Sequence, residues 1–237
     1  MDRLSDSLAV GLLSLGLKAG DRIGIWISNR WEWVVTQIAA AKSDLILVTI
    51  NPAYRSSEFH YAAKLVHLRA LILQWKLKQS DYRDIFDGAG NVPSLEFLIE
   101  VGDSVRDGWI SFNQLIQKNF SPPASVPSAI SDPHASCNIQ FTSGTTGHPK
   151  GTTLSHHNII NNAYFHAERM RLTQADVLVG CHSHTYAHAH THTHTHTSAL
   201  PHPRTPTYTS AFSLTHSLPS LPLRSPLFPC TIALDVS

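Results

Sequence analysis

The sequence lacks a dominant charge, a disulfide framework and a long hydrophobic run. Its 237 residues carry 18 Lys and Arg against 17 Asp and Glu, a net charge of +1 that gives no electrostatic reason to expect nucleic acid as a partner. Three cysteines are too few for a disulfide scaffold and indicate a reducing compartment. No run of about 18 apolar residues occurs, so no transmembrane segment is predicted. Hydrophobic residues make up 42%, which is enough to build a core.

The composition changes abruptly near residue 180. Residues 181–237 hold nine of the 16 histidines and seven of the 14 prolines, but no Gly, Lys or Glu. All 12 glycines and all but three of the charged residues lie in 1–180. We therefore predict a domain over 1–180 and a His-, Thr-, Pro- and Ser-rich tail over 181–237 that is disordered.

Short apolar runs alternate with helical patterns through the first part of the chain. The sequence predicts strands at 21–27, 45–50, 70–73, 97–101 and 138–141, and helices at 4–15, 31–42, 56–66 and 112–118. Either Ser56 or Ser57 is expected to cap the third helix. Residues 121–136 are rich in Pro, Ser and Ala and predict an exposed connector. This alternation predicts an α/β domain, a parallel sheet flanked by helices.

One ten-residue stretch carries the chemistry: Thr142-Ser143-Gly144-Thr145-Thr146-Gly147-His148-Pro149-Lys150-Gly151. Glycines let backbone N–H groups approach an anion closely. The hydroxyls can donate to phosphate oxygens or help to place magnesium, and Lys150 supplies a mobile positive charge. The stretch is predicted to follow a strand and to precede a helix over 156–170 capped by Ser155. A strand, phosphate loop and helix in that order favour anion binding.

The stretch is not a Walker A loop. That loop requires Gly-Lys-Ser/Thr at its end, whereas Gly147 is followed by His148 and Lys150 by Gly151. An ordinary phosphate-loop ATPase or GTPase is therefore disfavoured. A flexible Gly/Thr linker is the other alternative, but a linker does not require the ordered alternation of glycine and hydroxyl residues.

The stretch resembles the signature phosphate loop of the adenylate-forming acyl-CoA synthetases, acyl-AMP ligases and luciferases. The resemblance continues upstream through Gly20–Trp26, Asn29, Glu32-Trp33, Ala41-Lys42 and Ile50–Arg55. It covers about residues 1–180 and implies a partial AMP-binding domain, the N-terminal part of the family's large domain. Within the family, the upstream residues are most similar to the mitochondrial medium-chain acyl-CoA synthetases.

The resemblance implies a two-step reaction on small-molecule substrates. ATP and a fatty acid, with Mg2+, would give an acyl-adenylate and pyrophosphate, and CoA would then give acyl-CoA and AMP. The implied phosphate-binding residues are Thr142, Ser143, Gly144, Thr145, Thr146, Gly147, His148, Pro149 and Lys150. The resemblance assigns no catalytic residue and no metal ligand in this chain.

Several segments that the family carries after this loop have no counterpart in the sequence. They include an aromatic-Gly-x-Thr-Glu segment, a ribose-binding aspartate, and a small domain with a catalytic lysine. We therefore expect a fragment or truncated isoform of a fatty acid–CoA ligase that is inactive alone. The resemblance implies the mitochondrial matrix for the full-length relative. No presequence precedes Met1, so we predict no compartment for this chain.

The histidine-rich tail allows two further interpretations. The His-Thr alternation over 190–197 matches a translated CA repeat, which suggests an aberrant translation product. The alternative is a metal-binding module, because His190, His192, His194 and His196 would share one face of an extended chain. His156 and His157 open the predicted helix and either face the nucleotide site or only pack. A sheet cut short is also expected to leave an apolar edge strand.

Overall fold

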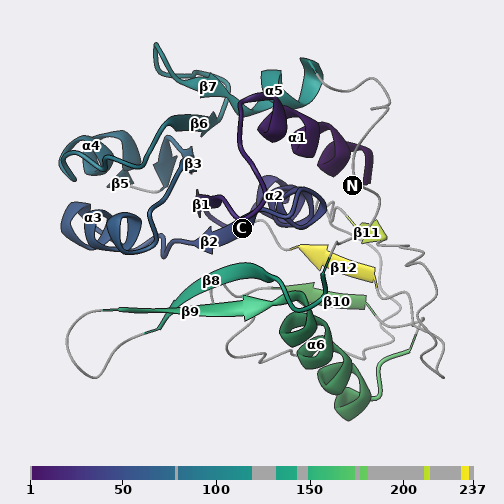
Figure 1. Cartoon of the computed structure of the whole chain (residues 1–237). Helices are drawn as coiled ribbons and strands as arrows, with labels where there is room; N and C mark the ends of the chain where they lie inside the picture. Colours follow the sequence, from purple (N-terminus) through teal and green to yellow (C-terminus); the bar gives the residue numbers. More distant parts are fainter. Residues whose placement is uncertain are drawn as a thin grey trace.

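The computed structural model describes residues 2–77, 80–118, 132–142 and 149–173, together with the backbone of 177–180, 211–213 and 231–234 (Figure 1). Its main helices are α1 (Asp2–Ser14), α2 (Trp31–Lys42), α3 (Ser56–Leu65), α4 (Tyr82–Asp87), α5 (Phe112–Lys118) and α6 (His156–Met170). The strands of its large sheet are β1 (Arg22–Trp26), β2 (Ile46–Thr49), β3 (Ala70–Gln74), β6 (Phe97–Val101), β7 (Ile110–Ser111), β8 (Ser136–Thr142) and β9 (Lys150–Ser155).

The large sheet has seven strands in the order β7-β6-β3-β1-β2-β8-β9. Every neighbouring pair is parallel except β8 and β9, which form an antiparallel hairpin. The central strands are buried on both faces, as all five residues of β3 show. A parallel strand covered on both sides needs such a continuous apolar run. The predicted α/β architecture with a parallel sheet is confirmed.

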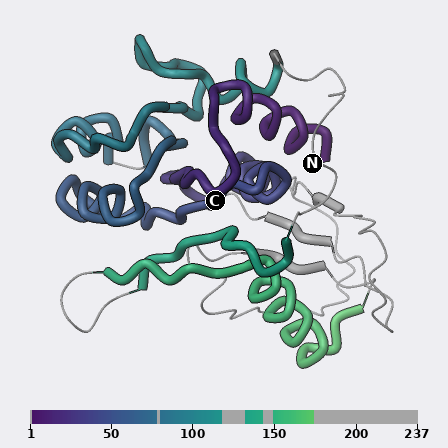
Figure 2. The backbone as a smooth tube through the Cα atoms, viewed as in Figure 1, coloured from purple at the N-terminus to yellow at the C-terminus, as the bar shows by residue number. Residues whose placement is uncertain are grey.

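Two apolar layers cover the sheet. One face packs against α1, α2 and α5, whose side chains join Ile23, Ile25 and Ile72 in one core cluster. The other face packs against α3 and α4, where Trp26 stacks on Phe59 with ring centroids 4.7 Å apart. Figures 1 and 2 show the sheet running between these helices. The domain is therefore a three-layer arrangement with its core on both sides of β1.

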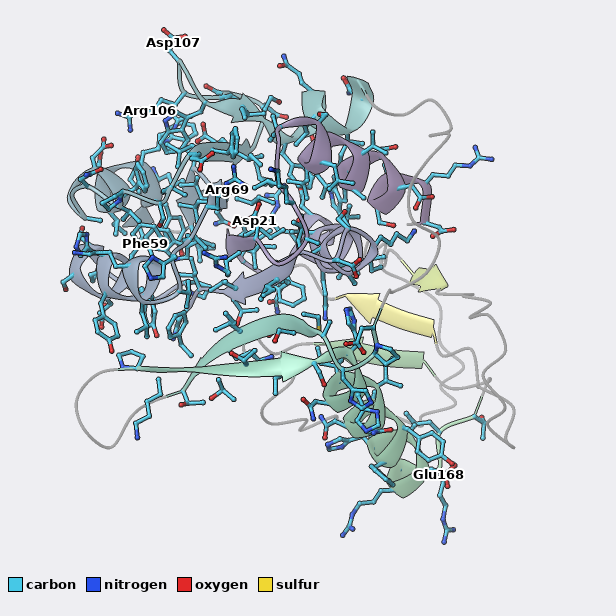
Figure 3. All side chains as sticks on the ribbon, in the orientation of Figure 1. Asp21, Phe59, Arg69, Arg106, Asp107 and Glu168 are labelled. Atoms are coloured by element: carbon cyan, nitrogen blue, oxygen red, sulfur yellow. The ribbon has the colours of Figure 1, made fainter. Side chains whose placement is uncertain are left out.

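Ion pairs close the amino-terminal edge of the sheet. Arg69, just before β3, binds Asp21 before β1 and also Glu96 before β6. Figure 3 shows Asp21 and Arg69 close together. The neighbouring Arg22 donates from Nε to the carbonyl oxygen of Val66 at 2.8 Å. These contacts tie the amino-terminal ends of β1, β3 and β6 together.

Several element boundaries differ from the sequence prediction. The residue before α3 is Arg55, and Ser56 is the first helical residue, so the predicted serine cap is wrong. The Ser56 hydroxyl donates instead to the carbonyl oxygen of Ile85 at 2.7 Å, which ties α3 to α4. The prediction also missed α4, whose cap is Asp81, because a six-residue helix has too few turns to show a periodic pattern.

The edge of the large sheet is polar rather than apolar. Its outer strand β9 has the sequence Lys-Gly-Thr-Thr-Leu-Ser, and its first four residues are exposed. The expectation of an apolar edge strand is therefore not met at β9. A polar edge with a charged residue at its start lowers the tendency to pair with another chain.

Two smaller sheets complete the described structure. β4 (Lys76–Leu77) pairs with β5 (Ser80–Asp81), and β10 (Val177–Gly180), β12 (Thr231–Leu234) and β11 (Ala211–Ser213) form a three-stranded sheet. Most of 181–237, including the histidine alternation, lies outside the described residues. So does most of the predicted connector at 121–136. The tail boundary at residue 180 stays a prediction.

Candidate functional site at the carboxyl edge of the sheet

The strand order creates a switch point between β1 and β2. The helix that follows β1 is α2, which packs on one face of the sheet, whereas the helix that follows β2 is α3, on the other face. Open α/β sheets bind ligands at the carboxyl ends of neighbouring strands whose following helices lie on opposite faces of the sheet. β8 lies parallel to β2, so it ends at the same edge.

The predicted phosphate-binding stretch is the connection of the β8–β9 hairpin. Its first residue, Thr142, pairs across the hairpin with Lys150, and both side chains are exposed. The Thr142 hydroxyl donates to the carbonyl oxygen of Lys150 at 3.5 Å. Residues 143–148 lie outside the described residues. The structure thus brings the two ends of the stretch together at the carboxyl end of β8.

The loop after β2 packs against the base of this hairpin. The ring of Tyr54 meets the ring of Phe141 edge-on, with centroids 6.4 Å apart. Asn51 fixes the same loop, because its side-chain oxygen accepts from the Ala53 amide at 2.9 Å and its carbonyl oxygen accepts from Trp26 Nε1 at 3.1 Å. The strand end that carries Thr142 is therefore held against a rigid neighbour.

A row of amides on β8 leads toward Thr142. Asn138 and Gln140 lie on the same face of the strand as Thr142, since side chains alternate along a strand. Both are buried, at 2% and 5% exposure, and Asn138 Oδ1 and Gln140 Nε2 have no hydrogen-bond partner. Buried polar atoms without a partner cost about 1–3 kcal/mol each. The sequence analysis missed this row, although two amides within an apolar strand were the available signal.

The helix after the stretch is placed differently from the prediction. Strand β9 separates the stretch from α6, because its threonines favour a strand and pair with β8. Ser155 does cap α6, with its hydroxyl accepting from the Asn158 amide at 3.2 Å. That cap lies five residues beyond Lys150, about 17 Å along the strand. The helix dipole therefore does not reach the loop, and the predicted strand–loop–helix order is wrong.

The two histidines at the start of α6 pack at the far end of the hairpin. His156 is 6% exposed, and burial lowers its pKa. His157 lies over the ring of His134, with centroids 4.8 Å apart, and its Nε2 is 2.7 Å from the side-chain nitrogen of Asn161. Of the two alternatives for these histidines, the structure supports packing rather than contact with the loop.

Neither a metal site nor a reactive thiol is found within the described ranges. No group of three or more His, Cys, Asp or Glu side chains there could hold a metal ion. Burial raises the pKa of Cys137 to about 11, which keeps this thiol protonated. The candidate ligands His190, His192, His194 and His196 lie outside the described residues. No helix in the described part is both long and apolar enough to cross a membrane.

Comparisons with known proteins agree with this architecture. The model of the AMP-binding enzyme family matches residues 1–208. The chain is 39% identical over 188 residues to the medium-chain acyl-CoA ligase ACSF2, mitochondrial, of Bos taurus, and 40% identical over 185 residues to the protein of that name from Danio rerio. These matches cover 71% and 70% of this chain but 30% of each relative.

The fold is also similar to a solved structure. The anthranilate CoA ligase AuaEII, determined in complex with anthranoyl-AMP, superposes with a TM-score of 0.70 at 24% identity. The match covers 77% of this chain and 34% of that ligase. The chain therefore spans about a third of the length of the proteins it resembles. On the family match and on relatives more than 30% identical, this chain belongs to the AMP-binding enzyme family, and it is acyl-CoA ligase-like.

Proposed function

We propose that the chain supplies the ATP phosphate-binding loop of an acyl-CoA ligase that acts on a medium-chain fatty acid. The observation that carries the proposal is the hairpin connection between Thr142 and Lys150, at the carboxyl edge beside the β1–β2 switch point. The acyl class comes from the bovine and zebrafish relatives, which are named as medium-chain acyl-CoA ligases. The residues proposed to hold the phosphates are Thr142 through Lys150.

The proposed chemistry assigns these residues an electrostatic role. When the fatty-acid carboxylate attacks the α-phosphorus of ATP, the bond to the bridging oxygen breaks and pyrophosphate leaves with the electron pair. Lys150 and the loop hydroxyls neutralise the charge that develops on this leaving group. Backbone N–H groups of the glycines donate to its oxygens. The loop supplies no nucleophile and no base.

Magnesium fits this loop through oxygen ligands only. Mg2+ in such sites is held by substrate phosphates, water and one or two protein oxygens. The Thr142 hydroxyl is exposed at the mouth of the loop and is one such oxygen. The ion supplies Lewis-acid polarisation of the phosphates when bound. We propose that magnesium arrives with ATP, bound to its phosphates.

We further propose that these 237 residues bind ATP without completing the ligase reaction by themselves. The support is that the match covers 30% of the bovine relative, and that the family's adenine, ribose and catalytic-lysine segments have no counterpart in the sequence. In this proposal residues 1–180 form the AMP-binding part and 181–237 a tail outside it. Limited proteolysis followed by mass spectrometry tests the boundary; stable cleavage well before residue 180 would contradict it.

Binding of ATP tests the loop directly. Titrating the chain with Mg-ATP by calorimetry should show binding that Lys150→Met weakens about tenfold, the effect of losing one charge-assisted contact. Lys64→Met is the matched control, because Lys64 is an exposed lysine on α3 outside the loop, and its affinity should stay within about twofold. Equal loss of ATP affinity in both variants would contradict the proposal that the loop binds ATP.

Exchange between ATP and pyrophosphate tests the proposed inactivity. With octanoate present, the purified 237-residue chain should show no exchange above the background of a protein-free sample. Exchange that depends on octanoate would show that these residues form the adenylate unaided, and would refute that part of the proposal. The calorimetric result is independent of this outcome.

A further inference from the structure

Three buried polar side chains lie together where β2 and β8 pair. Asn138 lies beside Leu47 in the strand register, and Leu47 belongs to the core cluster that α1, α2 and α5 cover. Gln140 lies beside Thr49, two residues farther along each strand, so all of these side chains share one face of the sheet. Thr49, Asn138 and Gln140 are each buried. We call these three residues the amide site.

The hydrogen-bonding groups of the amide site are incompletely used. Asn138 Oδ1 and Gln140 Nε2 are buried and have no hydrogen-bond partner among the described residues. The Thr49 hydroxyl donates to the carbonyl oxygen of Ile139 at 3.4 Å, which is long for such a bond. Its oxygen also has lone pairs that can accept. Because buried polar groups are almost always paired, with protein or with ordered water, the site calls for a further partner.

The chemistry of the free groups restricts what that partner can be. It must donate to Asn138 Oδ1 and accept from Gln140 Nε2, so neither a simple cation nor a simple anion serves both. A large organic ligand would need an opening to solvent, whereas all three side chains are buried. Water donates twice and accepts twice. It therefore satisfies the pair, even if one amide group is turned over so that its oxygen and nitrogen exchange places.

The spacing of the two amides also suits a single water. Alternate residues of a strand lie about 7 Å apart and point to the same face. Two hydrogen bonds of about 2.9 Å that meet at one water oxygen span about 5 Å, which two amide side chains leaning toward each other reach without any change in the backbone. Thr49 adds a third group from the neighbouring strand, and buried waters make about three hydrogen bonds.

We propose that the amide site binds one buried water molecule. The water accepts from Gln140 Nε2 and donates to Asn138 Oδ1 and to the Thr49 hydroxyl oxygen. It joins β2 to β8 two residues before Thr142, and so it supports the strand end from which the proposed phosphate-binding loop starts. The inference goes beyond the proposed function, because the site needs neither ATP nor CoA.

NMR of the full 237-residue chain, with its Asn and Gln side chains labelled with 15N, tests the site directly. A long-lived water gives NOE and ROE cross-peaks of opposite sign, and we expect such peaks with water at the side-chain amide protons of Gln140. Asn138→Leu removes one partner of the bridge and should abolish them. The matched control is Gln114→Met, a change at an exposed glutamine of α5, which should leave the Gln140 peaks as they are.

Two results of this measurement would overturn the proposal. One is the lack of a long-lived water at Gln140 in the parent chain, a result that depends on no variant. The other is Gln140 peaks that persist in folded Asn138→Leu, because the water would then not be shared by the two amides. Mg-ATP titration of the same samples reports separately on the loop, since the water site is occupied whether or not the loop binds ATP.

Urea unfolding supplies a second, thermodynamic arm. Asn138→Leu and Gln140→Met each leave one amide and the water without a partner, so each should raise the unfolding equilibrium constant about tenfold. The double variant leaves neither amide unpaired. Its effect should therefore be smaller than the product of the two single effects. Effects that simply multiply would show that the two amides do not share a partner, and would overturn the bridge.

Discussion

Gly24 lies in the middle of β1, where no larger residue fits without moving its neighbours. A Cβ atom at this position would lie 3.0 Å from Ile50 Cδ1 and 3.0 Å from Leu68 Cδ2. Its backbone needs no left-handed conformation, so the constraint is space and not strain. This single residue allows the strand to approach the second apolar layer closely.

Replacing Gly24 with valine should therefore destabilise the protein. Overpacking a dense core costs about 1–3 kcal/mol, partly offset because the contacted atoms are side-chain ends. Urea unfolding followed by tryptophan fluorescence measures the change. Gly151→Ala is the control, since its nearest Cβ contact is an ordinary 3.4 Å to Ile139 Cγ2, and it should change stability by less than about 0.5 kcal/mol. Equal losses in both variants would contradict the packing argument.

The buried amides of β8 show that the sequence can predict a strand without predicting the hydrogen bonding of its side chains. Asn138 and Gln140 were predicted as part of a strand, and that prediction is confirmed. That Asn138 Oδ1 and Gln140 Nε2 are buried without hydrogen-bond partners depends on what packs across the sheet, and periodicity carries no information about this. Thr142 and Lys150, in contrast, were singled out by residue type alone. Their pairing across a hairpin was not, because no strand was predicted over residues 150–155.

At the scale of elements, α6 carries a pH-sensitive end. His156 sits in the first turn, and burial lowers its pKa below the ordinary value, against the opposing influence of Asp44 and Asp132. The neutral form is therefore the one that the folded state favours. Above a pH of about 6.5, the histidine is neutral in the unfolded state as well, so its burial does not reduce the free energy of unfolding. As the pH falls below that value, the unfolded state gains the proton first and stability is lost.

Removing His156 should flatten this dependence. We expect His156→Gln to lose less stability than the parent chain between pH 7 and pH 5, measured by urea unfolding at each pH. Ser155→Ala serves as the comparison, because it removes the helix cap at about 1 kcal/mol without removing the histidine, so its pH profile should keep the parent slope. If His156→Gln kept that slope too, the buried histidine would not be the titrating group.

Elements with strong patterns were predicted correctly, and those without them were missed. The apolar run of β3 and the periodicity of α2 identify these elements before any contact is known. α4 has six residues and β7 has two, too short for either period to be visible. β9 is an edge strand, and its polar residues satisfy neither the alternating nor the continuous apolar pattern.

At the scale of the whole molecule, stability is distributed unevenly. β1 and β3 lie between two apolar layers, whereas β9 and α6 lie at one edge with exposed side chains. Regions with few buried contacts open with low free energy, while the core opens only on global unfolding. In the described part of the domain, we therefore expect high local stability at β1 and β3 and low local stability at β9 and α6, beside the candidate site.

Native-state hydrogen exchange should display this gradient. Amides of β3 are expected to exchange at least about 100-fold more slowly than those of α6, as core segments do relative to marginal ones. The comparison is internal, because both sets are read from the same sample. Equal protection in β3 and α6 would contradict this gradient, because it would show that α6 is as stable as the core.

The sequence by itself determined the fold class and singled out the stretch that we propose to bind phosphate. Continuous apolar runs can be buried only in a covered parallel sheet, and the Gly- and hydroxyl-rich stretch from Thr142 to Gly151 suits phosphate wherever it is placed. Only the tertiary structure decided that this stretch closes a hairpin, that α6 begins about 17 Å from it along β9, and that Ile160, Tyr164 and Phe165 of α6 are exposed. The physical reason is that strand pairing and the covering of a helix face depend on contacts between residues far apart in the chain, which local pattern does not encode.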